Sequence, residues 1–174
     1  MNKLIERAKS IKCLICDLDG VLTDGLLYIG DHLNELKAFH IRDGVGLKLM
    51  MHAGIEVAVI TGSRNAAVDH RMQQLGIIHY YKDQLNKQEA YGQLKTKLNL
   101  QDEQIAYIGD DLPDAPIMQQ VGLSVAVADA AYQIKEIAMW QTTFPGGRGA
   151  VRELCELILH AQNKMDLAIT GYLK

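Results

Sequence analysis

The chain is 174 residues long, which suits one domain with a substantial hydrophobic core, and we expect residues 1–174 to form a single domain. Its net charge of −3 argues against nucleic acid or a membrane surface as a partner. The N-terminal segment lacks the apolar core of a signal peptide, and no run approaches the length of a membrane span, which predicts a cytoplasmic protein. A site for an anionic ligand must therefore be built from local charges.

Short apolar runs alternate with segments of helical character along the chain. The expected strands are residues 11–17, 55–60, 77–81, 105–109, 124–128 and 139–143. The expected helices are residues 3–9, 43–52, a segment ending near residue 75, 86–98, 113–121, 132–138 and 150–162. This alternation predicts an α/β fold with a doubly wound, mainly parallel sheet that helices cover on both faces.

Residues 26–41 depart from this alternation. Two apolar segments flank a Gly-Asp turn there, which predicts a β-hairpin inserted after the first strand. The hairpin carries more apolar side chains than an exposed hairpin needs, so we expect it to be buried against another subunit. At the other end of the chain, residues 163–174 are expected to form a loosely attached tail.

Polar residues gather where the predicted strands end. The carboxyl ends of parallel strands meet at one edge of a sheet, which is where ligands bind in open α/β folds. Taken singly, each of these residues could belong to a turn or a helix cap, but their joint placement favours a site. They are Asp17 and Asp19 after the first strand, Thr61 and Gly62 after the second, Lys87 after the third, and Asp110, Asp111 and Asp114 after the fourth.

This set of groups is suited to phosphoryl transfer. A carboxylate can attack phosphorus and form an acyl phosphate, which divides one difficult step into two easier ones. Mg²⁺ prefers oxygen ligands and offsets the repulsion between carboxylates and a phosphate. The Lys87 ammonium, the Thr61 hydroxyl and nearby backbone N–H groups would stabilise the remaining phosphate oxygens.

The motifs occur in the order Asp-x-Asp-Gly-Val, Thr-Gly, Lys and Gly-Asp-Asp-x-x-Asp over residues 17–114. This ordered set resembles the haloacid dehalogenase superfamily of phosphatases. The resemblance implies that Asp17 is the nucleophile and that Asp19 is the general acid and base. It also implies that Asp17, Asp110 and the backbone carbonyl of Asp19 hold Mg²⁺.

The same resemblance implies roles for the other strand-end residues. Thr61, Gly62 and Lys87 would bind the phosphate. Asp111 and Asp114 would orient the metal ligands and Lys87. For Asp114 the alternative is a simple first-turn aspartate near a helix N-terminus.

The gaps between the motifs leave no room for a separate lid domain, so we expect the fold to be lidless. Such a site either takes a large substrate or is closed by a neighbouring subunit.

The wider chain, over about residues 10–165, resembles the 3-deoxy-D-manno-octulosonate 8-phosphate (KDO 8-phosphate) phosphatases of lipopolysaccharide synthesis. That family implies hydrolysis of the sugar phosphate to KDO and phosphate by a homotetramer whose hairpins pack together. The runs that carry the resemblance are residues 19–25 (DGVLTDG), 35–44 (ELKAFHIRDG), 106–111 (AYIGDD), 124–130 (SVAVADA) and 146–153 (GGRGAVRE).

Such a substrate carries a carboxylate and hydroxyls, so cations are expected near the site, and arginine is well shaped for a carboxylate. Lys48 and Arg71 could instead belong to solvated helix faces, and His40 could be satisfied by local hydrogen bonds. The substrate-binding residues implied by the resemblance are Asp19, His40, Ile41, Arg42, Asp43, Gly44, Lys48, Ser63, Arg64, Arg71 and Lys87.

One position departs from the family pattern. The family usually has Thr-Gly-Arg after the second strand, whereas this chain has Ser63 before Arg64. A shift by one residue turns a side chain by about 100° around a helix, so the departure bears on the substrate. Arg148 lies in a glycine-rich loop that either closes over a neighbour's site or is simply flexible.

Two other functions remain open at this point. The first is a phosphatase for another acidic sugar phosphate, such as a nine-carbon sialic-type sugar 9-phosphate. The second is a receiver domain that responds to phosphorylation, which also combines Asp, Thr and Lys on a doubly wound sheet. Receivers carry the phosphoacceptor after the third strand, but the third strand here ends in Tyr80 and Tyr81.

Overall fold

The computed structural model describes residues 2–31 and 35–173 of the chain. A six-stranded parallel sheet lies at its centre, in the order β5-β4-β1-β6-β7-β8. The strands are β1 (Cys13–Cys16), β4 (Glu56–Ile60), β5 (His79–Tyr81), β6 (Ile105–Gly109), β7 (Leu123–Ala126) and β8 (Trp140–Gln141). The predicted doubly wound α/β fold is therefore confirmed.

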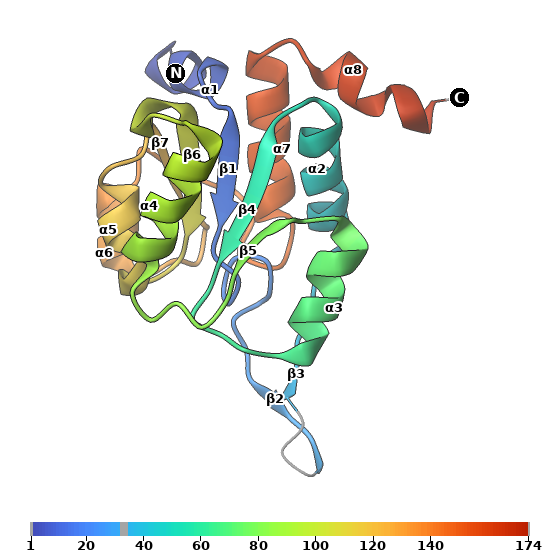
Figure 1. Ribbon diagram of the computed structural model, residues 1–174, viewed down its shortest axis with the longest axis vertical. Helices are drawn as coiled ribbons and strands as arrows, with labels where there is room; N and C mark the ends of the chain where they lie inside the picture. The colour runs from blue at the N-terminus through green and yellow to red at the C-terminus, as the bar shows by residue number, and fades with distance from the viewer. Residues whose placement is uncertain (1, 32–34, 174) are drawn as a thin grey trace.

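Helices cover both faces of this sheet. In Figure 1, α2, α3 and α7 lie on one face and α4, α5 and α6 on the other. The helices are α1 (Asn2–Lys9), α2 (Ile41–His52), α3 (Ala66–Leu75), α4 (Lys87–Leu98), α5 (Ala115–Met118), α6 (Tyr132–Ile137), α7 (Ala150–Ala161) and α8 (Met165–Ile169). Within the described residues, no helix has both the length and the apolar character needed to cross a membrane.

The central strands explain where the polar residues gather. Every residue of β1 and β6 is buried, as expected for strands that are covered on both faces. Cys16 is in register with Val59 on one side and Ile108 on the other. The three strands therefore end at nearly the same level, and the residues that follow them meet at one edge of the sheet.

The helix predicted at residues 113–121 is shorter than expected. A 3-10 turn at Leu112–Asp114 precedes α5, and α5 ends at Met118. The backbone N–H of Gly122 donates to the carbonyl of Asp102 at 2.7 Å, so the chain turns away to begin β7. A tertiary hydrogen bond ends this helix, which local sequence does not reveal.

The predicted hairpin is present and short. β2 (Tyr28–Ile29) pairs antiparallel with β3 (Glu35–Leu36), and the hairpin extends beyond the body of the molecule in Figure 1. Its apolar side chains are largely exposed in the single chain: Leu26 by 56%, Leu27 by 69%, Ile29 by 66% and Leu36 by 63%. An exposed apolar cluster of this kind is typical of an interface.

The expectation of a loosely attached tail does not match the structure. Residues 165–169 form α8, which packs against α2 and α7. Ala168 is fully buried, and its carbonyl lies 3.0 Å from the Nδ1 atom of His52. Residues 165–169 are therefore docked on the helical layer by both apolar burial and a hydrogen bond, whereas residues 170–173 are exposed.

Asp43 links two helices of the same layer. It lies in the first turn of α2, is 1% exposed, and accepts hydrogen bonds from the backbone N–H groups of Gly149 (3.2 Å) and Arg152 (2.8 Å). These N–H groups belong to the N-terminal end of α7, where the helix itself provides no acceptors. Burial raises the pKa of Asp43, and the hydrogen bonds oppose this rise.

We predict that Asp43→Ala lowers the free energy of unfolding by about 2–3 kcal/mol, because it leaves two partly buried N–H groups without acceptors. Asp43→Asn retains one oxygen acceptor and should lose less than Asp43→Ala. Urea denaturation followed by circular dichroism measures both values. An alanine variant as stable as the wild type would contradict this role.

Candidate active site

A pocket of about 390 Å³ opens at the carboxyl edge of the sheet. Its lining includes Ser63, which was predicted to contact the substrate, and Gln84 and Leu85, for which no role was predicted. The wall contains every residue to which the family resemblance gave a role in catalysis, in phosphate or metal binding, or in orienting those groups: Asp17, Asp19, Thr61, Gly62, Lys87, Asp110, Asp111 and Asp114. Their convergence follows from the parallel register of β4, β1 and β6.

Lys87 lies at the centre of the site. It follows Asn86, whose side chain caps α4 by accepting from the N–H of Gln88 at 3.2 Å. The Lys87 Nζ atom lies 2.5 Å from Asp17 Oδ1 and 2.7 Å from Asp114 Oδ1, and the lysine is 7% exposed. Burial lowers the pKa of Lys87, but the two carboxylates outweigh burial and raise it, so the lysine is protonated.

Asp114 acts as an anchor for Lys87. Its Oδ1 atom also accepts from the Tyr107 hydroxyl at 2.6 Å, and its Oδ2 atom accepts from the backbone N–H groups of Asp110 (3.0 Å) and Asp111 (3.4 Å). Both oxygens are therefore engaged by protein donors. This network is larger than the simple first-turn aspartate that the sequence left as an alternative.

Asp17 and Asp110 are the carboxylates best placed to hold a cation. Oxygen atoms of Asp17, Asp110 and Asp114 lie within 4.8 Å of one another. Because protein donors occupy Asp114, the carboxylates of Asp17 and Asp110 remain as ligands, together with the Asp19 backbone carbonyl that the family resemblance implies. These oxygen ligands fit a hard divalent cation such as Mg²⁺.

The electrostatics of the two carboxylates also favour a cation. Burial and then the charge of Asp114 raise the pKa of Asp17, while Lys87 opposes the rise. Burial and then the charges of Asp17 and Asp114 raise the pKa of Asp110. The repulsion that raises both values would be relieved by a bound cation.

Gly20 allows the backbone to approach Asp110. Its φ of +88° lies in the left-handed region, which favours glycine. A Cβ atom at this position would overlap the Asp110 carboxylate. Both the conformation and the close approach therefore explain the glycine after Asp19.

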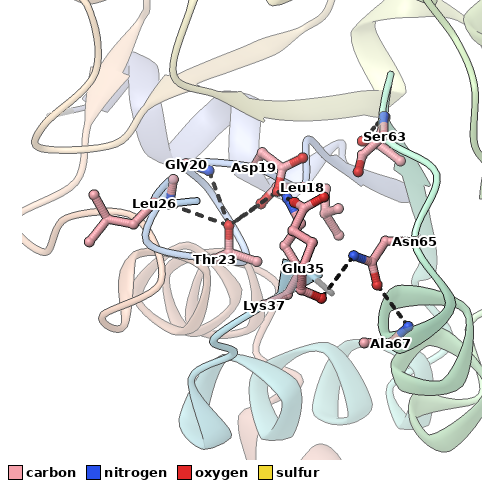
Figure 2. Close-up of polar contacts among 12 residues, drawn as sticks. Leu18, Asp19, Gly20, Thr23, Leu26, Glu35, Lys37, Ser63, Asn65 and Ala67 are labelled. Atoms are coloured by element: carbon pink, nitrogen blue, oxygen red, sulfur yellow. Dashed lines mark hydrogen bonds and ion pairs between the residues drawn. The ribbon is translucent and has the colours of Figure 1, made fainter. Parts of the chain in front are cut away.

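Asp19 lies in the wall of the pocket, and one of its carboxylate oxygens is hydrogen-bonded by two other side chains. Its Oδ1 atom accepts from Lys37 Nζ at 2.7 Å and from the Thr23 hydroxyl at 3.5 Å (Figure 2). The side chain of Lys37 is 3% exposed and lies 2.5 Å from Glu35 as well. Lys37 was not predicted as a site residue, although it lies within the run 35–44 that carried the family resemblance.

Thr61 is 1% exposed, and its hydroxyl oxygen accepts from the N–H of Ser63 at 3.0 Å, which shapes the turn after β4. The Nη1 atom of Arg64 lies 3.7 Å from Asp83, and the Arg64 side chain is 76% exposed. Arg64 is not among the described residues that line the pocket. The expectation that Arg64 contacts the substrate therefore has no support within one chain.

The other residues predicted to bind the sugar lie outside the catalytic pocket of the single chain. Among the described residues, none of them lines the catalytic pocket of the single chain, although all stay predicted substrate contacts for an assembly. Arg71 packs against Gly44 and lies 5.8 Å from the Phe39 ring, while Arg42 and Arg148 line a separate pocket of about 410 Å³. The residues are His40, Ile41, Arg42, Asp43, Gly44, Lys48 and Arg71.

We predict that stabilisation by Mg²⁺ increases with pH. The pKa values of about 6 for Asp17 and about 8 for Asp110 lie above the ordinary range, so at acidic pH the folded protein holds protons that Mg²⁺ must displace. At about 100 times its dissociation constant, Mg²⁺ should raise the melting temperature by about 5–10 °C near pH 8.5.

The same Mg²⁺ concentration should raise the melting temperature by less than half as much at about pH 5.5, where the carboxyl groups of Asp17 and Asp110 hold protons. Differential scanning fluorimetry with Mg²⁺ or with EDTA measures the shift. Asp110→Asn should remove most of the shift at both pH values. An equal or larger shift at the acidic pH would contradict this assignment.

Comparison with known proteins places the chain in a family. A model of haloacid dehalogenase-like hydrolases matches residues 64–153. The chain is 52% identical to the 3-deoxy-D-manno-octulosonate 8-phosphate phosphatase KdsC of Yersinia pestis over 165 residues, which are 95% of this chain and 88% of that protein.

Solved structures agree with this placement. One from Legionella pneumophila, assigned to subfamily III A of the haloacid dehalogenase superfamily, has a TM-score of 0.98 and 66% identity and covers 99% of this chain and 95% of that one. The KDO 8-phosphate phosphatase of Moraxella catarrhalis, in complex with magnesium ion, phosphate ion and KDO, has a TM-score of 0.94 and 41% identity and covers 99% of each chain. The protein belongs to the haloacid dehalogenase-like hydrolases and, within them, to the family of the KDO 8-phosphate phosphatases.

Proposed function

We propose that the protein hydrolyses KDO 8-phosphate to KDO and phosphate in lipopolysaccharide synthesis, with Mg²⁺ as its cofactor. The buried Lys87, which holds Asp17 and Asp114 in the wall of the pocket, is the observation that carries the proposal. The 52% identity to the Yersinia enzyme and the Mg²⁺, phosphate and KDO in the Moraxella complex support the substrate and the cofactor.

In the proposed reaction Asp17 attacks the phosphorus atom. The bond between phosphorus and the sugar oxygen breaks, and Asp19 donates a proton to the leaving alkoxide. Asp19 then takes a proton from water, which attacks the aspartyl phosphate and releases phosphate with Asp17 restored. Lys87 and the Thr61 hydroxyl bind the phosphate oxygens during both steps.

Asp17, Asp110 and the Asp19 carbonyl would hold Mg²⁺, and the ion supplies positive charge that offsets the repulsion between phosphate and carboxylates. Asp111 and Asp114 keep the surrounding backbone and Lys87 in place. Asp114 does so through the hydrogen bonds given above.

We also propose that the active form is a homotetramer in the cytoplasm. The exposed apolar side chains of the hairpin support an interface between copies of the chain. The sugar-pocket residues at the start of α2, which include Arg42, would then contact substrate in a neighbouring subunit's site together with Arg148. Their separation from the pocket of the single chain supports this arrangement.

The substrate is tested by phosphate release from KDO 8-phosphate and from a nine-carbon sialic-type sugar 9-phosphate. We expect the eight-carbon substrate to have the higher kcat/KM, and EDTA to abolish the activity. Asp17→Asn, which keeps the shape of the side chain but removes the nucleophile, should lower kcat at least about 1,000-fold with an unchanged circular dichroism spectrum. A preference for the nine-carbon substrate would overturn the substrate, and an active Asp17→Asn variant would overturn the mechanism.

The assembly is tested by placing charge in the hairpin. Leu27→Glu combined with Ile29→Glu should convert the tetramer to smaller species, because burying two carboxylates in an apolar interface is unfavourable. Light scattering measures the mass, and kcat/KM should fall at least about 10-fold as the neighbour's contacts are lost. Ile78→Glu is the control, since Ile78 is 78% exposed outside the hairpin. A fully active wild-type monomer would refute the arrangement.

A further inference from the structure

We propose that Lys37 is a positioning residue that selects which oxygen of Asp19 faces the substrate. Lys37 Nζ donates to Asp19 Oδ1 at 2.7 Å, but Lys37 is not among the described residues that line the pocket. The Thr23 hydroxyl lies on the same oxygen at 3.5 Å. With Oδ1 held in this way, Oδ2 is the atom available for transferring a proton at the sugar oxygen.

The position of Lys37 is determined by contacts on both sides of it in the chain. Before Lys37, the Glu35 carbonyl accepts from Asn65 Nδ2 at 3.3 Å, and the Asn65 side chain also caps α3 through the N–H of Ala67 at 2.8 Å (Figure 2). After Lys37, Phe39 forms a bridge with Thr23. The segment that carries Lys37 is therefore attached to two parts of the fold, and this attachment fixes where its ammonium group lies.

The chemistry of the pair suits orientation rather than phosphate binding. The Lys37 side chain is 3% exposed, and two carboxylates lie within 2.7 Å of its nitrogen. Lys37, unlike Lys87, is not among the described residues that line the pocket, so its ammonium group is not placed to bind a phosphate oxygen. Its ion pair with Asp19 instead restricts the rotation of the Asp19 side chain.

This inference rests on the proposed role of Asp19 in proton transfer, and it makes a prediction about leaving groups. An alkyl sugar phosphate needs a proton on its leaving oxygen, whereas p-nitrophenolate leaves without one. Both substrates pass through the same aspartyl phosphate, whose hydrolysis needs Asp19 as a base. A misplaced Asp19 therefore slows the first step only for the sugar phosphate, and slows the second step for both.

The test compares Lys37→Met, which keeps the length of the apolar stem, with the wild type in rapid-quench and stopped-flow experiments with Mg²⁺. We expect the first turnover of KDO 8-phosphate to slow at least about 10-fold with KM changed less than about 2-fold. The first release of p-nitrophenolate from p-nitrophenyl phosphate should keep its rate and appear as a burst before a slower steady state. Lys37→Arg should recover part of the loss because it restores the charge.

Lys95→Met is the matched control, because Lys95 forms a pair with Asp102 at 2.6 Å outside the pocket and should leave both rates unchanged. Equal slowing of the two first turnovers in Lys37→Met would indicate a merely structural role and overturn the inference, as would no slowing of either. A wild-type enzyme that hydrolyses neither substrate would overturn the proposed function itself.

Discussion

The structure depends on burying one lysine between carboxylates. Lys87 is almost inaccessible and contacts both Asp17 and Asp114. Transfer of such ions from water is unfavourable by several kcal/mol each, and only direct pairing with further hydrogen bonds recovers this energy. Tyr107 and two backbone N–H groups supply these bonds to Asp114. Because the members come from the end of β1, the start of α4 and the turn after β6, their pairing holds three elements at one edge of the sheet.

The same arrangement leaves an excess of negative charge. Asp110 lies near Asp17 and Asp114, and one lysine does not neutralise all three carboxylates. Burial and mutual repulsion raise the pKa values of Asp17 and Asp110. A divalent cation relieves this repulsion and gives the pocket the positive charge that a phosphate ester requires. The overall charge of the chain is negative, so the attraction for phosphate arises locally, from Lys87, the cation and the N–H groups around Thr61.

The hairpin lies between the proposed subunit interface and the general acid. Its apolar side chains face outward, while Lys37, directly after β3, reaches back to Asp19. Contacts to Asn65 and the bridge between Thr23 and Phe39 hold its base against the body of the fold. A subunit that packs on the hairpin would therefore stabilise the segment that orients the general acid.

The strand ends, the order of the catalytic motifs and the hairpin are predictable from the sequence, because apolar runs end at Asp17, Thr61 and Asp110, and parallel strands must end at one edge. Other contacts are not predictable in this way. Lys37 and Asp19 are 18 residues apart, and Asp43 caps a helix that begins more than 100 residues later. The docking of α8 and the direction of Arg64 toward Asp83 likewise follow from packing. Periodicity specifies which face of an element is apolar, whereas these contacts depend on side-chain directions and on elements that only the folded chain brings together.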